Sequence, residues 1–360
     1  MKYNEFTAAD WSRIRQDWTA WWDGTLERPL VLIWTREPGH PPGSIHDNLV
    51  RWPAGTDAQS ILDYYQPHLE TTHYHGDAFP QWWLNAGPGI VASFLGSAPH
   101  FADDGGWGTT WFERLGVDSL NEIHPTYDPH NAWWLHCQNL MKAAIARWGD
   151  TVVMGCTDLG GNMDILASLR GTMELLYDCF DNPAEIDRLT RAITALWLRY
   201  FDEMQAIIDT GAPGMSYWAE FWSPGPGYML QSDFCYMISP EMFERFVLPD
   251  LETCCAHIEY PFYHLDGKGQ LIHLERMLQI PNLRGIQWQP GDGQPLADGW
   301  LDVLRQIREA GKLCQVFVNR KGAMTIAREL GGAGFQFQVT AEGLTPEEAD
   351  AFVAEIHALA

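Results

Sequence analysis

The sequence predicts an α/β protein, a (β/α)8 barrel of the TIM type with an N-terminal helical extension. Short apolar strand patterns alternate with helical patterns of roughly ten or more residues, which is typical of parallel βαβ units. Roughly eight such units can be distinguished, the number that closes a barrel. No GxGxxG or Walker sequence follows a predicted strand, which disfavours the alternative of an open, nucleotide-binding doubly wound sheet. We therefore predict one barrel domain over residues 1–360 and no nucleotide cofactor.

The first half of the chain contains four of the predicted strands. A short helix from about Thr7 to Trp22 is expected to pack outside the core, and the continuous apolar run from Pro29 to Trp34 is typical of a strand buried on both faces. Residues 97–128 are rich in Gly, Asp, Trp and Pro and predict an excursion above the barrel. The other predicted elements are helices at 57–75, 129–148, 163–179 and 181–209 and strands at 81–84, 151–154 and 214–218.

The second half alternates more regularly. Ser239 and Thr345 each precede a Pro and predict the N-caps of two helices. Further helices are predicted at 270–278 and 300–310 and from the end of the seventh strand to Leu330. The predicted strands lie at 261–264, 285–288, 313–318 and 335–339.

Composition excludes several classes of function. The formal net charge is −24, which repels phosphate backbones and anionic lipids, so neither nucleic acid nor a membrane surface is an expected partner. The N-terminal residues lack the apolar stretch of a signal peptide, and no run of about 18 apolar residues occurs. The seven cysteines form no CxxC pair and predict mostly buried thiols in a reducing, cytoplasmic compartment.

Candidate functional residues follow from the barrel itself. In this fold the chemistry lies at the C-terminal ends of the strands, so polar and aromatic residues at those positions are expected to face a small-molecule substrate. They are Asn85, Asp158, Asn162, Trp218, Glu220, Trp222, His264, Asp266, Gln287, Trp288, Asn319 and Gln338.

The pair His264 and Asp266 is the sharpest of these candidates. The two residues are two apart in an extended segment, so both side chains can point to the same side. Such a pair can bind a divalent metal, act as acid and base, or bind hydroxyl groups. A His–Asp hydrogen bond that only stiffens the strand end is the alternative.

Aromatic residues flank a second candidate acid. Trp218 and Trp222 lie on either side of Glu220, which predicts an aromatic wall with a carboxylate for substrate binding; barrel packing around a solvated Glu is the alternative. Asp233 and Tyr236 lie farther along, where an Asp either caps loop backbone or faces the pocket.

Several segments together resemble the uroporphyrinogen decarboxylase superfamily over most of the chain, from about Arg28 to the end. The resemblance implies a barrel whose active site is the mouth. The superfamily contains true decarboxylases and cobalamin-linked methyltransferases. The motifs are GNMDILASLRG at 161–171, LLYD at 175–178, DNP at 181–183, SPEMFERFVLP at 239–249, YHLDG at 263–267 and, for one subgroup, QWQPG at 287–291.

Departures from the family pattern narrow the chemistry. True decarboxylases carry an arginine-rich segment after the first strand and a catalytic Asp after the second, whereas this chain has only Arg36 at the first place and Asn85 without an Asp at the second. Uroporphyrinogen is therefore not the expected substrate. The methyltransferases bind zinc through His-x-Cys and a later Cys; here His264 matches and Asp266 replaces the first Cys. A harder metal on His264 and Asp266, or no metal, is expected instead of a thiolate zinc site.

The resulting hypothesis is a corrinoid-linked methyltransferase or demethylase of a small methylated or methoxylated compound. The chain has no DxHxxG cobalamin motif, so the corrinoid would be carried by a separate partner protein. His264, Asp266 and Glu220 would supply acid, base or metal ligation. A decarboxylase or other lyase acting on a non-porphyrin acid is the first alternative, with Arg36, Lys268 and Arg320 as carboxylate-binding candidates. A non-catalytic barrel that binds a sugar or aromatic ligand is the second.

Overall fold

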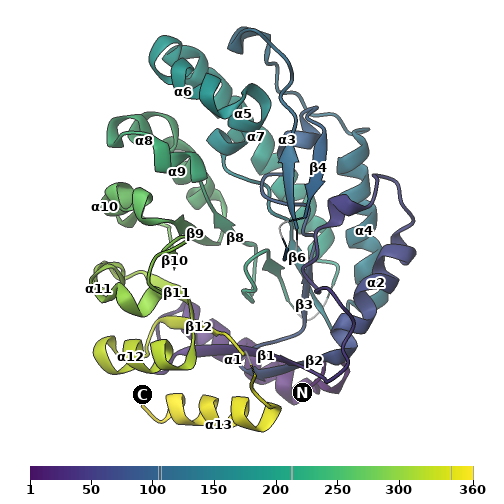
Figure 1. The fold of residues 1–360 in the computed structure, drawn as a ribbon, viewed down its shortest axis with the longest axis vertical. Helices are drawn as coiled ribbons and strands as arrows, with labels where there is room; N and C mark the ends of the chain where they lie inside the picture. Colours follow the sequence, from purple (N-terminus) through teal and green to yellow (C-terminus); the bar gives the residue numbers. More distant parts are fainter. Residues whose placement is uncertain (104, 107, 212–213, 342, 360) are drawn as a thin grey trace.

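The strands form a curved wall around a common core in the computed structural model, which describes residues 1–103, 105–106, 108–211, 214–341 and 343–359 (Figure 1). The barrel pairs are parallel, and β2 runs antiparallel to β1 at one edge. The first sheet has the order β2 (Thr72–Gly76), β1 (Leu30–Arg36), β12 (Phe335–Val339), β11 (Leu313–Val318), β10 (Gly285–Gln289), β9 (Tyr260–Asp266) and β8 (Gly227–Leu230). The second has the order β3 (Gln81–Trp83), β6 (Val153–Cys156) and β7 (Ser216–Tyr217).

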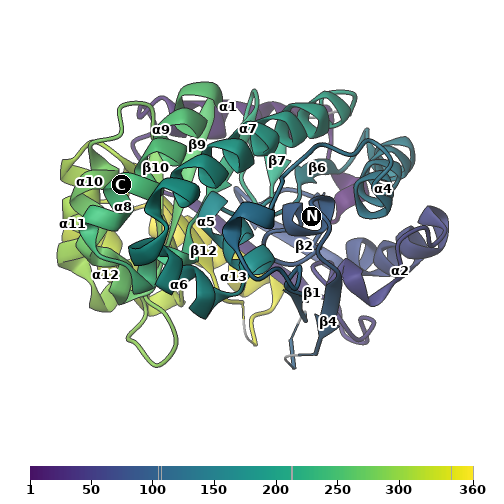
Figure 2. The ribbon, with the colours of Figure 1, turned by 90° about the horizontal axis from the view of Figure 1, so that it is seen from above.

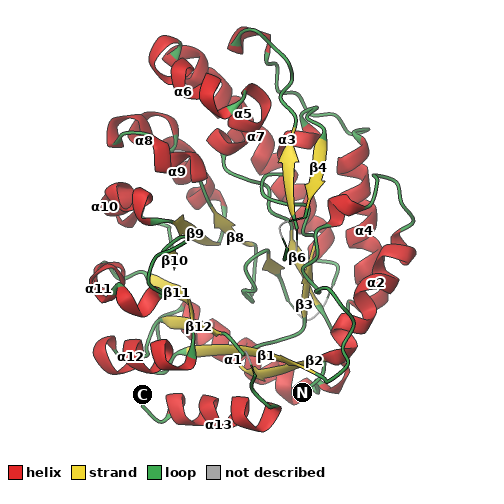
Figure 3. Ribbon diagram, viewed as in Figure 1, coloured by secondary structure: helices red, strands yellow, loops and turns green. Residues whose placement is uncertain are grey.

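Helices surround this wall, as expected for βα units that bury both faces of each strand (Figure 3). Ser239, Asn319 and Thr345 each cap a helix N-terminus with a side-chain oxygen. The helices are α1 (Ala8–Trp22), α2 (Ala58–Thr71), α3 (Val91–Phe94), α4 (Ala132–Trp148), α5 (Asn162–Arg170), α6 (Thr172–Asp181), α7 (Pro183–Ile208), α8 (Pro240–Phe246), α9 (Leu248–His257), α10 (Leu274–Leu278), α11 (Leu301–Glu309), α12 (Arg320–Leu330) and α13 (Pro346–His357). The predicted barrel with a helical N-terminal extension is confirmed.

Helix α1 closes the end of the barrel at which the strands begin. Trp18, Trp21 and Trp22 are all buried, and the indole N–H of Trp21 donates to the carbonyl of Phe335, the first residue of β12. The β4–β5 hairpin (Pro99–Ala102 and Thr109–Phe112) lies on the other side of the molecule (Figure 2). This hairpin belongs to the excursion predicted at 97–128, of which residues 104 and 107 lie outside the described residues.

Three local predictions are corrected by the structure. The helix predicted to reach residue 75 ends at Thr71, because the residues of β2 pair with β1 instead. The helix predicted over 163–179 is divided between α5 and α6 by Gly171, whose φ of 102° suits glycine. No strand is predicted between residues 218 and 261, yet Gly227–Leu230 forms β8, which pairs with β9.

The stretch between β7 and β8 is a tight reversal in place of a helix. Met215 and Ser223 exchange two backbone hydrogen bonds of 3.3 and 3.0 Å across an antiparallel bridge. Glu220 lies inside this reversal and is pointed into the barrel, since it is buried and contacts Gln338 of β12. Among the described residues, no helix is long and apolar enough to cross a membrane.

Candidate functional site

Three side chains, two from the C-terminal end of β9 and one from the 3-10 helix that follows β8, form what we call the mouth cluster. They are His264 and Asp266 of β9 and Asp233 of the short 3-10 helix at Asp233–Met237. One ligand atom from each of the three lies within 4.8 Å of the others. His264 and Asp266 thus share one face of an extended strand, as their spacing predicts, and the chain fold adds Asp233 from a different element.

Neighbouring side chains hold the His264 ring in one orientation. Its Nδ1 is hydrogen-bonded to Oε1 of Gln287, which is its register partner on β10. With the Gln287 amide oxygen as acceptor, Nδ1 donates this hydrogen bond, and Nε2 lies 3.9 Å from Asp266 Oδ2. The Trp218 ring packs edge-on against the imidazole with centroids 5.4 Å apart, and its N–H donates to the Met229 carbonyl over 3.1 Å.

The electrostatics of the mouth cluster favour a bound cation. Burial raises the pKa of Asp266, the charges of Asp233 and Asp292 add to this, and His264 acts in the opposite direction. Burial and the charge of Asp233 also raise the pKa of the neighbouring Asp164 to about 8. Asp164 accepts hydrogen bonds from the backbone N–H groups of Asp233 and Phe234, at 3.1 and 2.8 Å, and so fixes the position of Asp233.

The donor set of the mouth cluster fits a divalent metal ion. It offers one imidazole nitrogen and two carboxylates, a mixture that suits borderline or hard ions such as Mn²⁺, Fe²⁺ or Zn²⁺. The hydrogen bond from His264 to Gln287 is the kind of support that metal-ligating histidines ordinarily have. All seven cysteines lie among the described residues as buried free thiols, and none belongs to the cluster.

A cavity of about 400 Å³, which we call the mouth cavity, adjoins the cluster at Asp233. Its wall includes Trp111 of the β4–β5 hairpin, Gln231 and Met237. Trp111 and Met237 are 69% and 47% exposed, so the cavity opens onto solvent through an apolar rim. A ligand could therefore enter between the hairpin and the mouth cluster.

A second cavity, of about 190 Å³, lies around Glu220 and is called the Glu220 chamber below. Oε1 of Glu220 is 3.3 Å from Nε2 of His46, and Oε2 accepts a 3.4 Å hydrogen bond from the amide of Gln338. Burial raises the pKa of Glu220 to about 7. Burial and the charge of Arg36 lower the pKa of His46 to about 3, so the imidazole is neutral at physiological pH.

A row of glutamines links the two sites across the inner face of the sheet. Gln287, which holds His264, is the register partner of Gln315 on β11. The Gln315 amide donates to Oε1 of Gln338 over 3.0 Å, and Gln338 in turn donates to Glu220. Glutamine side chains on three adjacent strands therefore lie between the mouth cluster and the Glu220 chamber.

Several of the predicted substrate-binding residues hold the framework instead of facing either cavity. Asn85 donates to the His46 carbonyl over 2.6 Å and so positions the loop that carries His46. Asp158 accepts from Gly160 N at 2.8 Å and from Gln231 at 3.2 Å, and burial raises its pKa to about 7. Tyr236 is about half exposed and packs against Gly267 and Gly269, beside the mouth cluster.

Other predicted residues lie away from both cavities. Trp222 is 3% exposed, and its carbonyl accepts from the indole of Trp22 at the closed end of the barrel. Trp288 points away from the barrel axis and packs edge-on against Trp300 at 5.4 Å. Asn162 donates to the Phe246 carbonyl and lines a separate cavity beside α7. Neighbouring residues on a strand face opposite sides of the sheet. Position at a strand end alone therefore did not distinguish the residues that face a cavity from those that face away.

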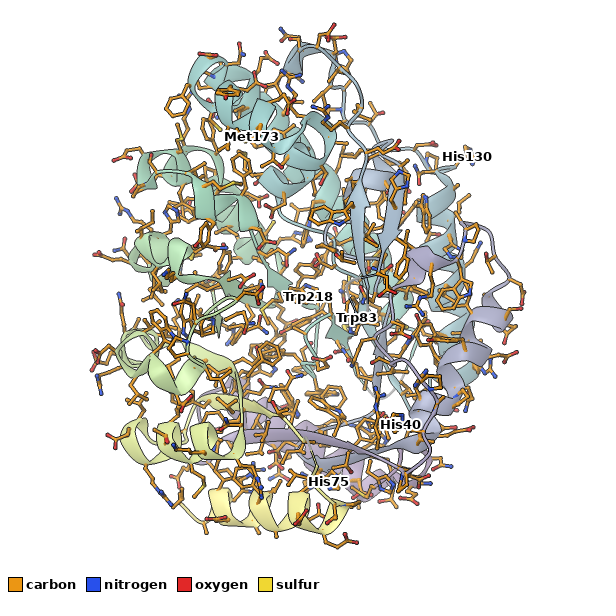
Figure 4. The ribbon with its side chains drawn as sticks, in the orientation of Figure 1. His40, His75, Trp83, His130, Met173 and Trp218 are labelled. Carbon is orange, nitrogen blue, oxygen red and sulfur yellow. The ribbon has the colours of Figure 1, made fainter. Side chains whose placement is uncertain are left out.

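Two side chains of the site were not predicted from the sequence. His46 belongs to an irregular segment after β1, and no periodicity or motif marks it. Asp164 lies within the recognised 161–171 motif, so its place in that motif was an available signal. Figure 4 shows Trp218 and Trp83 near the centre of the barrel, and the Trp83 ring lies 6.3 Å from His46.

Comparison with known proteins bears on the fold. A methyltransferase from Methanosarcina mazei has a similar structure, with a TM-score of 0.60 and 12% sequence identity over 96% of this chain and 98% of that chain. A B12-independent methionine synthase from Shewanella sp. W3-18-1 gives a TM-score of 0.36 and 9% identity over 72% of this chain and 73% of that chain, too distant to support an argument. No protein-family model and no curated protein matches the sequence.

Proposed function

We propose that the protein is a methyl-transfer enzyme that demethylates a small methylated or methoxylated compound. The observation that carries this proposal is the mouth cluster, a preoriented His264 with Asp233 and Asp266 next to the mouth cavity. The similarity of the barrel to a methyltransferase over nearly the whole chain supports the reaction class. The segments that resemble the uroporphyrinogen decarboxylase superfamily, which contains methyltransferases, also agree with this reaction class.

In this proposal His264, Asp233 and Asp266 would hold a divalent ion, which would supply Lewis-acid chemistry at a lone-pair atom of the substrate, such as a methoxy oxygen. Gln287 keeps the imidazole in the tautomer that leaves Nε2 toward the cluster. Trp218 restricts the ring by edge-on contact. When the methyl group leaves, its former heteroatom keeps the bonding electron pair. A methoxy donor then becomes an oxyanion that the site must stabilise or protonate, whereas a quaternary ammonium donor becomes a neutral amine.

A separate corrinoid protein is the proposed methyl acceptor. The acceptor must approach from the open side of the barrel, and the mouth cavity is bordered there by the exposed side chains of Trp111 and Met237. Exposed apolar side chains around an opening are typical of surfaces that contact another protein. In this proposal the mouth cluster activates the methyl donor, and the partner protein binds over the mouth and accepts the methyl group.

The decarboxylase alternative needs a cationic site for a carboxylate. Arg36 lines the Glu220 chamber, but its guanidinium is already bonded to Gly43 O at 2.8 Å and Ser44 Oγ at 3.2 Å. Lys268 is exposed, and Arg320 lines a groove between α12 and α13. These positions give the lyase reading less support than the mouth cluster gives methyl transfer.

The test is a methyl-transfer assay with a free corrinoid in its reduced Co(I) state as acceptor. The purified protein is loaded with Mn²⁺, Fe²⁺ or Zn²⁺ and offered a panel of methylated amines and methoxylated aromatics, while the corrinoid absorbance reports methylation. Turnover should require the metal and be lost in Asp266→Asn but retained in Asp292→Asn, which changes a nearby carboxylate outside the cluster. Metal-independent turnover, or equal loss in both variants, would contradict the assignment.

A further inference from the structure

The Glu220 chamber has the composition of a binding site for a small organic cation. Its walls include the aromatic side chains Trp34, Tyr74 and Phe79. Trp34 and Tyr74 are cross-strand partners on β1 and β2, so their rings share one face of that strand pair. Aromatic faces attract ammonium groups, with the largest effect where water is excluded.

Glu220 supplies the negative charge inside this aromatic wall. Only 8% of the residue is exposed. Its two oxygens have contacts of 3.3 Å to a neutral His46 and 3.4 Å to the Gln338 amide, both longer than charge-assisted hydrogen bonds of about 2.8 Å. Within the part of the chain that the structure describes, this buried carboxylate has no close, charged partner of the kind that ordinarily accompanies burial.

The backbone of Glu220 is held in an unfavourable conformation. Its φ of 50° makes it the one non-glycine residue with positive φ among those that the structure describes. Such conformations are uncommon and tend to occur where a side chain must be presented to a ligand. The backbone bridge between Met215 and Ser223 closes the reversal that imposes this conformation and aims the carboxylate into the chamber.

The size of the chamber limits what it can hold. Its volume of about 190 Å³ lies below the range of drug-sized sites, roughly 300–1,000 Å³, and equals the liquid volume of about six water molecules. A sugar or a fused aromatic ring system is too large. A compact ammonium compound of a few heavy atoms fits.

We propose that the Glu220 chamber binds a small methylated ammonium compound, with Glu220 as counter-ion and Trp34, Tyr74 and Phe79 around the methyl groups. The role of this compound as methyl donor rests on the proposed function. The binding site itself is inferred from the residues of the chamber and does not depend on that function. The glutamine row from Gln338 to Gln287 lies between this chamber and the mouth cluster.

The test is calorimetric titration of the full chain with tetramethylammonium and choline, and with 3,3-dimethylbutan-1-ol as the uncharged isostere of choline. Both cations should bind, and the alcohol should bind at least about tenfold more weakly. Glu220→Gln should weaken cation binding at least about tenfold, whereas Glu113→Gln on the exposed β4–β5 side should not. Equal binding of choline and its isostere, or unchanged binding in Glu220→Gln, would overturn the proposal.

Two further variants keep the outcome interpretable. Ile45→Trp, from the loop that lines the chamber, fills the space without touching Glu220 and should abolish cation binding even if Glu220→Gln folds poorly. His264→Ala removes the mouth cluster and should leave cation binding intact. Cation binding without any methyl transfer would contradict the proposed function and still support the cation site. Methyl transfer from a neutral donor without cation binding would support the proposed function and contradict the cation site.

Discussion

His264 is placed by contacts that serve no packing purpose of their own. Gln287 holds one ring nitrogen, Trp218 covers an edge, and the other nitrogen faces Asp266. The side chain is 16% exposed, so it lies at the border between core and mouth. Removing it should affect the bound metal and the reaction much more than the fold.

His264→Ala is expected to abolish turnover and to lower the metal content of the purified protein. The free energy of unfolding should change by no more than about 1–2 kcal/mol, as for a residue outside the core. Metal analysis, turnover and denaturant unfolding measure the three quantities. His130→Ala, on the outer surface in Figure 4, is the control and should leave all three unchanged. If His264→Ala is unfolded, or keeps its activity, then His264 and Asp266 have only a structural role.

Glu220 should make stability depend on pH. Burial raises its pKa in the folded state from 4.5 to about 7, so the folded protein holds this proton more tightly than the unfolded chain. The stabilisation is fully present below pH 4.5 and is lost as the pH rises through about 7. The unfolding free energy of the wild type relative to Glu220→Gln should therefore fall on the order of 3 kcal/mol over this interval.

Denaturant unfolding of both proteins at several pH values between 4 and about 8 measures this difference. His46, Arg36 and Tyr74 also line the chamber and are present in both proteins, so their own effects cancel. A wild-type-minus-variant difference that stays constant across the range would show that Glu220 has an ordinary pKa.

Trp218 and Trp222 form a natural pair of test positions, four residues apart with opposite surroundings. Trp218 contacts His264, whereas Trp222 is buried at the closed end of the barrel next to α1. Trp218→Ala should free the His264 ring and lower turnover about tenfold or more, while leaving the fold intact. Trp222→Ala should cost about 3–5 kcal/mol of unfolding free energy. Turnover number and denaturant unfolding distinguish the two variants, and the reverse pattern would contradict this placement.

At the scale of elements, α1 stabilises the barrel by closing its lower end with indole rings. Trp18, Trp21 and Phe221 contact one another with ring centroids 5.7–5.8 Å apart, and the Trp22 ring contacts Phe262 of β9. The indole N–H of Trp18 donates to the Asp77 carbonyl over 3.1 Å. The helix thereby joins the beginnings of strands from both halves of the chain.

Trp21→Ala is expected to lower the unfolding free energy by about 3–5 kcal/mol, because it leaves a cavity among rings that cannot collapse into it. Trp111→Ala is the matched control, since that ring is 69% exposed, and its effect should stay within about 0.5 kcal/mol. Denaturant unfolding monitored by circular dichroism measures both. A small effect at Trp21 would mean that α1 is an appendage and not the closure of the barrel.

At the scale of the whole molecule, Asp77 joins both ends of the chain. This fully buried carboxylate accepts from both Nη atoms of Arg28 at 2.8 and 2.9 Å and from the backbone N–H of Val31 at 2.9 Å. His357 of α13 lies 3.7 Å away. Although burial alone would raise the pKa of Asp77, the hydrogen bonds from His357 and Arg28 hold it below its ordinary value.

Asp77→Ala should destabilise the protein by about 3–5 kcal/mol, because it leaves the Arg28 guanidinium partly buried without its main partner. The folded-state pKa is lowered, so the contribution of Asp77 is present above the unfolded-state value of 3.8 and is lost as the pH falls through the folded value. Thermal unfolding at neutral and acid pH should show the Tm of the wild type falling toward that of the variant as the carboxylate is protonated. If Asp77→Ala leaves the stability unchanged, Arg28 has other partners that suffice, such as Asp17 at 2.9 Å.

Much of the barrel follows from local pattern. The strands predicted at 313–318 and 335–339 have those same bounds as β11 and β12. Residues 313–318 are mostly apolar, as in a strand buried on both faces, and residues 335–339 alternate apolar side chains with glutamine, with the period of two that is typical of a strand. The period of two also places His264 and Asp266 on one face. Cap residues such as Ser239 and Thr345 mark helix starts because their side chains satisfy nearby backbone N–H groups.

Only the tertiary structure decided what local pattern leaves open. Residues 72–76 became a strand because β1 offered an unpaired edge, and Glu220 entered the barrel because a backbone bridge reverses the chain around it. Asp233 joined His264, and His46 reached Glu220, through contacts between segments far apart in the sequence. By itself the sequence determined the barrel and the two β9 side chains, since those depend on periodicities within single elements. Long-range packing decided the third acid and the chamber, since the closure of the barrel brings distant segments together.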